Sequence, residues 1–146
     1  MARPSGPLVK CDGMWTQAKF NSFIKNNLRS ATRKWAPIQK CKKRAHVGRG
    51  EYRCDGCGQV VPPTVVDETT RKRVKNIFVD HIEPIIDPAV GFTTWDECIE
   101  RMFCDLSNLQ LLCKPCHSVK SHEEIEIAKK RRAASKEELE VEFDEE

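Results

Sequence analysis

Two pairs of cysteines in this sequence have the spacing of ligands for a single metal ion. Cys54 and Cys57 form one Cys-x-x-Cys pair, and Cys113 and Cys116 form the second. Two thiolates three residues apart can lie on one tight turn, and two such turns supply the four sulfur ligands of a tetrahedral zinc site. The alternatives are disulfides or a redox pair. The sequence lacks the thioredoxin-like βαβ pattern expected around a redox pair, so the spacing favours structural Zn²⁺.

A site with four cysteine ligands is closed, so its metal has no position open to substrate and supports the fold. The other cysteines form no second pair of this kind and are expected to be ordinary thiols: Cys11, Cys41, Cys98 and Cys104. A chain of 146 residues, 39% of them hydrophobic, builds a modest core that such a metal would reinforce. Any chemistry must therefore come from other residues.

Side chains suited to acid–base and metal chemistry lie between and beside the two cysteine pairs. Asp80 and His81 lie in the run Val-Asp-His-Ile-Glu-Pro, and Asn108 opens the run Asn-Leu-Gln-Leu-Leu before the second pair. That pair is followed directly by His117. A neutral imidazole titrates near physiological pH and can take a proton from water, and carboxylate and imidazole groups can bind a divalent cation.

The joint pattern resembles the HNH (ββα-metal) endonuclease family, in its zinc-containing, phage-encoded form. Such members have CxxC, then DHI.P, then N-L-x-x-L-C-x-x-C-H-x-x-K, and this chain keeps that order from Cys54 to Lys120. Each piece alone is a weak signal, whereas the order and spacing together are specific.

The resemblance implies a metal-dependent DNA endonuclease that nicks or cuts DNA and leaves 5′-phosphate and 3′-hydroxyl ends. His81 would be the general base, and Asn108 would hold the adjoining loop and orient it. Asp80 and His117 would bind Mg²⁺ or Mn²⁺, and the imidazole ligand also admits Ni²⁺ or Co²⁺. DNA is the implied partner, with phage packaging proteins as a further class, in the host cytoplasm.

The chain departs from the family at one position. Some members have a second metal-binding histidine four residues after the position of His117, where this chain has Ser121. His122 follows one residue later, which turns its side chain by about 100° around a helix axis. The cation is therefore assigned to Asp80, His117 and solvent.

Each of these residues also has an ordinary structural explanation. Asp80 and His81 could satisfy backbone groups at a strand end, Asn108 could be a turn residue, and His117 could begin a helix or be a fifth zinc ligand. The alternative function is therefore a non-catalytic, zinc-dependent DNA-binding module. A third is a zinc ribbon that binds proteins. His46 is given no role.

The net charge of +3 hides an uneven distribution. Residues 1–50 carry 12 lysines and arginines against one acidic residue, whereas residues 136–146 carry seven acidic residues and one lysine. A basic segment of this kind is typical of nucleic-acid binding, although a solvated helix face is the alternative. The candidate DNA contacts are Lys25, Arg29, Arg33, Lys34, Lys40, Lys42, Lys43 and Arg44.

The elements that position these groups can be read from periodicity. Helices are expected over residues 14–35, 38–45, 95–103 and 114–132, and strands over 60–66, 75–82 and 109–113, with 67–75 as a loop. The predicted class is α+β: a basic helical arm (1–50), a ββα catalytic unit with a Cys₄ zinc site (51–132) and a mobile acidic tail (133–146). No apolar run could span a membrane, and a cytoplasmic location is expected.

Overall fold

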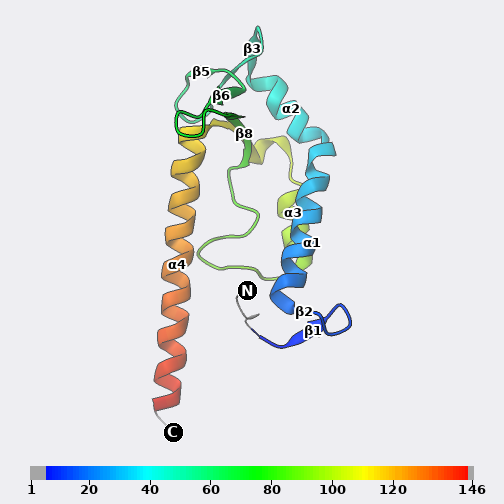
Figure 1. The fold of residues 1–146 in the computed structure, drawn as a ribbon, viewed down its shortest axis with the longest axis vertical. Helices are drawn as coiled ribbons and strands as arrows, with labels where there is room; N and C mark the ends of the chain where they lie inside the picture. Colours follow the sequence, from blue (N-terminus) through cyan, green and yellow to red (C-terminus); the bar gives the residue numbers. More distant parts are fainter. Residues whose placement is uncertain (1–5, 145–146) are drawn as a thin grey trace. The chain divides into compact units, whose positions relative to one another are not determined.

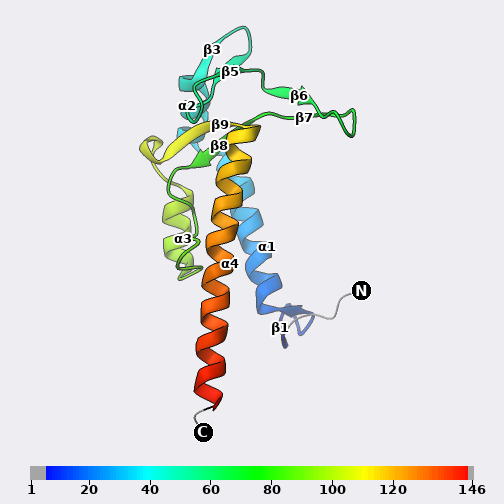
Figure 2. The same ribbon diagram turned by 90° about the vertical axis from the view of Figure 1, so that its left-hand side faces the viewer.

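Two strands of five residues each organise the larger part of the chain. The computed structural model describes residues 6–144, with side chains as far as residue 138. Strand β8 (Ile77–His81) pairs with β9 (Leu109–Cys113) in antiparallel register. Figure 2 shows the pair at the start of the long helix α4 (Lys114–Asp144). Because neighbours along a strand face opposite sides, this register decides which site residues share a face.

The chain forms two compact units, which divide between Trp35 and Ala36. The first contains β1 (Leu8–Lys10), β2 (Trp15–Thr16), α1 (Gln17–Ala31) and a 3-10 helix (Thr32–Lys34). The second adds to β8, β9 and α4 the elements α2 (Ala36–Ala45), β3 (His46–Gly48), β4 (Glu51–Arg53), β5 (Val60–Val61), β6 (Thr64–Val66), β7 (Arg73–Lys75), α3 (Trp95–Met102) and a 3-10 helix (Leu106–Asn108). The division lies before α2, which packs into the core of the second unit.

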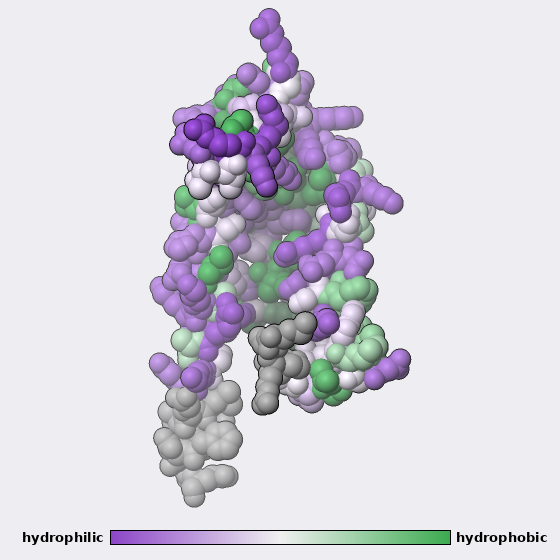
Figure 3. All heavy atoms as spheres, in the orientation of Figure 1, coloured by the Kyte–Doolittle hydropathy of each residue, from purple (hydrophilic) through white to green (hydrophobic). Residues whose placement is uncertain are grey.

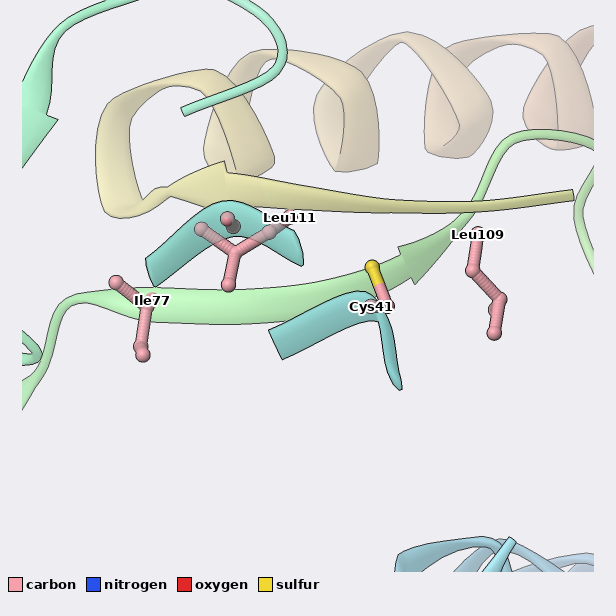
Figure 4. Close-up of a cluster of buried hydrophobic side chains, with 5 residues drawn as sticks. Cys41, Ile77, Leu109 and Leu111 are labelled. Atoms are coloured by element: carbon pink, nitrogen blue, oxygen red, sulfur yellow. The ribbon is translucent and has the colours of Figure 1, made fainter. Parts of the chain in front are cut away.

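One face of the β8–β9 pair forms that core. Ile77, Leu109 and Leu111 pack there against Cys41 and Ala45 of α2, and all five residues are buried. Figure 4 shows the Cys41 thiol directed toward the strand pair from the side of α2. A helix that covers one face of a small sheet is a standard way to bury the apolar side of both.

The opposite face of the pair is covered by the first turns of α4. Phe78 and Asp80 lie on this face, since they alternate with the core residues of β8. The Phe78 ring stacks on His117, and the Asp80 carboxylate pairs with Lys120. Residues three apart on a helix share a face, so both contacts come from one side of α4.

Helix α3 begins where its capping residues predict. The Oγ1 atom of Thr94 accepts a hydrogen bond from the backbone N–H of Glu97 at 3.2 Å, as in a helix N-cap. Cys98 and Met102 are the buried residues of the helix. The expected helix over residues 95–103 is confirmed to within one residue at its end.

Helix α4 is longer than the periodicity predicted. It begins at Lys114, as expected, but it runs to Asp144 and does not end near residue 132. Residues 133–144 contain no glycine or proline, and alanine, glutamate, lysine and leucine favour helix, so nothing in this segment ends the helix. Only residues 145–146 of the predicted mobile tail lie outside the described residues.

The small sheets differ from the expected pattern at two places. Strands β3, β4 and β5 form a three-stranded sheet in chain order, and β6 and β7 form a separate hairpin. The expected strand over 60–66 is divided into β5 and β6 by Pro62 and Pro63, which cannot donate to a ladder. The segment 67–75, expected to be a loop, ends in β7 and so closes the hairpin.

The observed architecture is mixed α+β, with four α-helices and small antiparallel sheets among residues 6–144 (Figure 1). The α+β class is therefore confirmed. In that same range, no helix is both long enough and apolar enough to cross a membrane.

Candidate metal centre and strand-end site

The four cysteines of the two pairs meet in space. The sulfur atoms of Cys54, Cys57, Cys113 and Cys116 all lie within 4.8 Å of one another. This distance suits four ligands around one ion, because thiolates at about 2.3 Å from zinc lie on the corners of a tetrahedron. The cluster could hold a metal ion such as zinc. Within residues 6–138, it is the one group of three or more potential metal-binding side chains that meets in this way.

Backbone hydrogen bonds shape the first cysteine turn, between β4 and β5. The N–H of Gly58 donates to the carbonyl of Cys54 at 2.9 Å, and the N–H of Cys54 donates to the carbonyl of Gln59 at 2.8 Å. At Gly56 an added Cβ would lie 3.2 Å from both Cys116 Sγ and Leu112 Cδ2. Glycine at this position therefore lets the first turn approach the second closely.

The electrostatics of the cluster favour a bound cation. Burial opposes charge on Cys54, but the backbone N–H groups of Cys113, Cys57 and Gly56 outweigh it and lower the pKa of that thiol to about 6. A hydrogen bond that the Cys116 thiol donates to Cys113, followed by burial, raises the pKa of Cys116 to about 12. The negative charge of one thiolate thus disfavours ionisation of the neighbouring thiols. A bound divalent cation would offset this repulsion between like charges.

Asp55, between the cysteines of the first pair, joins this turn to the strand pair. Its N–H donates to the carbonyl of Leu111 at 2.8 Å, and its Oδ2 accepts from the N–H of Leu111 at 2.7 Å. Arg44 of α2 lies 3.8 Å from the same oxygen and donates to the carbonyl of Leu109 at 2.8 Å. The cysteine cluster is therefore braced against both β9 and α2.

Asp80, predicted to bind a divalent cation, lies on the α4 face of β8. Its Oδ2 is 2.9 Å from Lys120 Nζ and accepts from Gln110 Nε2 at 3.2 Å. Lys120 Nζ also donates to the carbonyl of His81 at 2.9 Å and to Glu124 Oε1 at 2.6 Å. One ammonium group thus connects the end of β8 to α4. The Oδ1 atom of Asp80 has no hydrogen bond to the side chains or backbone that the structure describes.

His81 is the last residue of β8 and is held by the end of α3. Its Nε2 lies 2.8 Å from the carbonyl oxygen of Met102. A carbonyl oxygen only accepts, so Nε2 carries the proton in the neutral ring and Nδ1 is left as the acceptor. Nδ1 has no hydrogen bond to any residue from 6 to 138. The imidazole is therefore oriented with one basic nitrogen unused.

Asn108 holds the loop that follows His81. Its Oδ1 accepts from the N–H of Glu83 at 2.9 Å, and its Nδ2 donates to the carbonyl of Glu83 at 3.3 Å. The carbonyl of Asn108 also accepts from the N–H of Ile82 at 2.9 Å. These hydrogen bonds connect Asn108 to the loop at Ile82 and Glu83. Its effect on the orientation of His81 is indirect, through the backbone.

His117, the other predicted cation ligand, lies on the first turn of α4. Its ring stacks on Phe78 with centroids 4.3 Å apart and planes 10° from parallel. Asp80 is two residues beyond Phe78 on the same face of β8, so both predicted ligands lie between β8 and α4. No third ligand side chain joins them to form a cluster among the described residues. His122 is exposed, beside Glu126.

The basic residues predicted to contact DNA are divided between the two units. Lys25, Arg29, Arg33 and Lys34 belong to the first unit, and Lys40, Lys42, Lys43 and Arg44 lie on α2 in the second. Six of them are exposed, and Lys25 and Lys42 are half-buried. The guanidinium group of Arg44 contacts Leu109 and Asp55, which are distant in sequence. That of Arg33 donates to Ser30, three residues before it.

We call Asp80, His81, Asn108 and His117, with the side chains that contact Asp80, the strand-end site. Sequence analysis missed two of its side chains. Lys120 was part of the pattern Cys-His-x-x-Lys, and its spacing of three from His117 places it on the same helix face, but it was given no role. Gln110 lies opposite Asp80 in the register, which only the pairing of β8 with β9 reveals.

Comparison of the chain with protein-family models, with curated proteins and with solved structures gives no match.

Proposed function

We propose that this protein is a metal-dependent DNA endonuclease in which His81 is the general base. The observation that carries the proposal is the orientation of His81, whose Nε2 donates to the Met102 carbonyl and whose Nδ1 is left to accept a proton. Phosphodiester hydrolysis needs such a base, because an attacking water must lose its proton near neutral pH. The Met102 carbonyl orients the ring, and the Asn108 contact holds the loop that follows His81.

The donor set on the other face of β8 fits a hard divalent cation. Asp80 Oδ1 is unused by the described residues, and His117 presents an imidazole from the first turn of α4. A carboxylate oxygen suits Mg²⁺ or Mn²⁺, and the imidazole also admits Ni²⁺ or Co²⁺. When bound, the cation would neutralise charge on the phosphate and the leaving oxygen. Lys120 orients the Asp80 carboxylate through its Oδ2 atom.

We assign the cysteine cluster to structural Zn²⁺ and the arrangement of β8, β9 and α4 to the ββα-metal type. The closed set of four sulfurs supports the first assignment, because it leaves no position for substrate. Two antiparallel strands that run directly into a helix support the second. The basic residues of α1 and α2 would contact DNA phosphates without reading the sequence.

A non-catalytic, zinc-dependent DNA-binding module is the second candidate. The specific observation in its favour is that Asp80 is already paired with Lys120 and Gln110, as expected of a purely structural strand end. Such a module needs no base, so it predicts DNA binding that survives loss of His81.

A plasmid-nicking assay separates the two functions. Wild type, His81→Ala and the control His46→Ala are incubated with Mg²⁺, Mn²⁺ or Ni²⁺, and bound zinc is measured for each protein. Cleavage by wild type and His46→Ala, with loss of at least a hundredfold in His81→Ala at equal zinc content, is expected of a general base. DNA binding by all three without cleavage would establish the binding module. Equal cleavage by all three would remove His81 from the mechanism.

A further inference from the structure

A projecting ribbon in the second unit carries basic residues to which no role has been given. Strands β6 and β7 pair only with each other, and Figure 2 shows the hairpin directed away from β8, β9 and α4. Arg71, Lys72, Arg73 and Lys75 lie in its second half, and all four are exposed. Figure 3 shows mainly hydrophilic side chains gathered where this hairpin points toward the viewer.

The hairpin is held at both ends, although an isolated two-stranded ribbon is only marginally stable. At its base, the buried Asn76 donates from its backbone N–H to the carbonyl of Pro63 at 2.8 Å and from Nδ2 to the carbonyl of Pro62 at 3.0 Å. At its tip, Asp67 Oδ1 accepts from the N–H and the hydroxyl of Thr70 at 2.7 and 3.0 Å. The ribbon therefore presents its charges in a defined geometry.

Two of these charges share one face of the ribbon. In the register of the hairpin, Lys75 lies opposite Thr64 and Arg73 lies opposite Val66, whereas Val74 falls on the other face. Arg73 Nη1 donates to Thr64 Oγ1 at 3.0 Å, which fixes the direction of the guanidinium group. This face thus carries two positive charges beside Thr64 and the exposed Val66.

Lys75, on this face, also lies near Phe78 of β8 and near Lys42 of α2. Lys75 Nζ lies 5.0 Å from the centroid of the Phe78 ring, on which His117 stacks. Desolvation of its ammonium group and the neighbouring charge of Lys42 lower the pKa of Lys75, although the side chain as a whole is exposed. Neither lysine has a carboxylate partner among residues 6–138. Two cations held together without a counter-charge favour an anion between them.

We propose that Lys42, Lys75 and Arg73, here named the basic track, bind the phosphate backbone of duplex DNA and lead it to the strand-end site. The inference rests on the proposed function in taking DNA as the partner. Lysines act as point charges for phosphate, and arginine adds a bidentate contact. A two-stranded ribbon is also narrow enough for the major groove of DNA. The track adds a DNA contact from β7 to those expected from the two helices.

Salt dependence of DNA binding tests the track without cleavage. The triple variant Lys42→Gln, Arg73→Gln, Lys75→Gln is compared with wild type and with a control of equal charge change on α4, which is Lys129→Gln, Lys130→Gln, Arg132→Gln. Binding of a labelled duplex is measured by fluorescence anisotropy in EDTA at several salt concentrations. Each lost phosphate contact lowers the slope of log K against log salt by about 0.9, so the track variant should lose about 2.7 and the control almost nothing.

The inference is overturned if track and control variants lose equal slope, if neither loses any, or if wild type does not bind DNA. The single variant Arg73→Gln, at the exposed ribbon, keeps the test valid if the triple variant misfolds. Its slope of log K against log salt should fall by about 0.9. Hydrolysis of bis(p-nitrophenyl) phosphate, which is too small to reach the track, is measured in parallel. Track-dependent binding without hydrolysis of either substrate would refute the nuclease and leave the track standing.

Discussion

Replacement of Asn108 by alanine removes the contact that holds the loop after His81. The amide makes two hydrogen bonds to the backbone of Glu83, at 2.9 and 3.3 Å. A hydrogen bond within a protein contributes about 1 kcal/mol net, and the longer bond contributes less. Because Asn108 is half-buried, water can replace part of what is lost. The free energy of unfolding should therefore fall by about 1–2 kcal/mol.

Catalysis should fall further than stability in this variant. The loop begins at the residue after His81, so its release lets the imidazole shift relative to a bound phosphate. A displacement of about 1 Å at a reacting group costs roughly a hundredfold in rate. Urea unfolding followed by circular dichroism measures the stability, and nicking at saturating DNA measures kcat. Ser107→Ala, at the exposed neighbouring residue, is the control and should change neither.

Asn108→Asp separates the two hydrogen bonds. Aspartate still accepts from the N–H of Glu83, but the ionised carboxylate has no proton to donate to the Glu83 carbonyl. The variant should lose more stability at pH 7 than at pH 4, where the protonated carboxyl can donate. An unchanged free energy of unfolding in Asn108→Ala would contradict the assigned loop contact. Normal stability with lost cleavage would instead place the amide against the substrate.

Two further predictions concern the cysteine cluster and Lys120. A strong chelator under reducing conditions should lower the free energy of unfolding by several kcal/mol, because the cluster joins the first cysteine turn to β9. Cys113→Ser should show the same loss without a chelator, and Cys11→Ser, at an exposed thiol, should not. Burial opposes the charge on Lys120, but hydrogen bonds to Glu124 and Asp80 raise its pKa. Its stabilisation is thus complete at neutral pH and is lost as pH rises through the raised pKa, above about 10.4. In urea unfolding, the deficit of Lys120→Met relative to wild type should shrink from pH 8 to pH 11, and a constant deficit would contradict the charge contribution.

Local patterns in the sequence were sufficient to predict the helices and strands whose first residues are marked by a cap or an apolar run. The capping pair of Thr94 and Glu97 predicted where α3 begins, and the apolar run 109–113 predicted β9 to the residue. The cysteine spacing predicted the cluster, because the thiols of two cysteines three residues apart on one turn can bind the same metal ion. These predictions depend on contacts within a few residues, which periodicity and spacing encode directly.

Other features depended on which elements pack together. Arg44, one of the predicted DNA contacts, also donates to the carbonyl of Leu109, 65 residues away, which the sequence alone does not show. The segment 67–75 was expected to be a loop, but its end forms β7, whose pairing with β6 is visible only in the register. Pro62 and Pro63 divide the strand expected over 60–66 into β5 and β6.

The sequence by itself determined the types and order of the groups at the candidate sites. An aspartate, a histidine and an asparagine lie between two pairs of thiols, and a second histidine follows the second pair. Tertiary structure alone decided their partners. Lys120 reaches Asp80 across 40 residues because α4 crosses the face of β8 on which Asp80 lies, whereas His81 turns to α3 from the opposite face. Side-chain alternation along a strand is local, but what covers each face depends on packing of the whole unit.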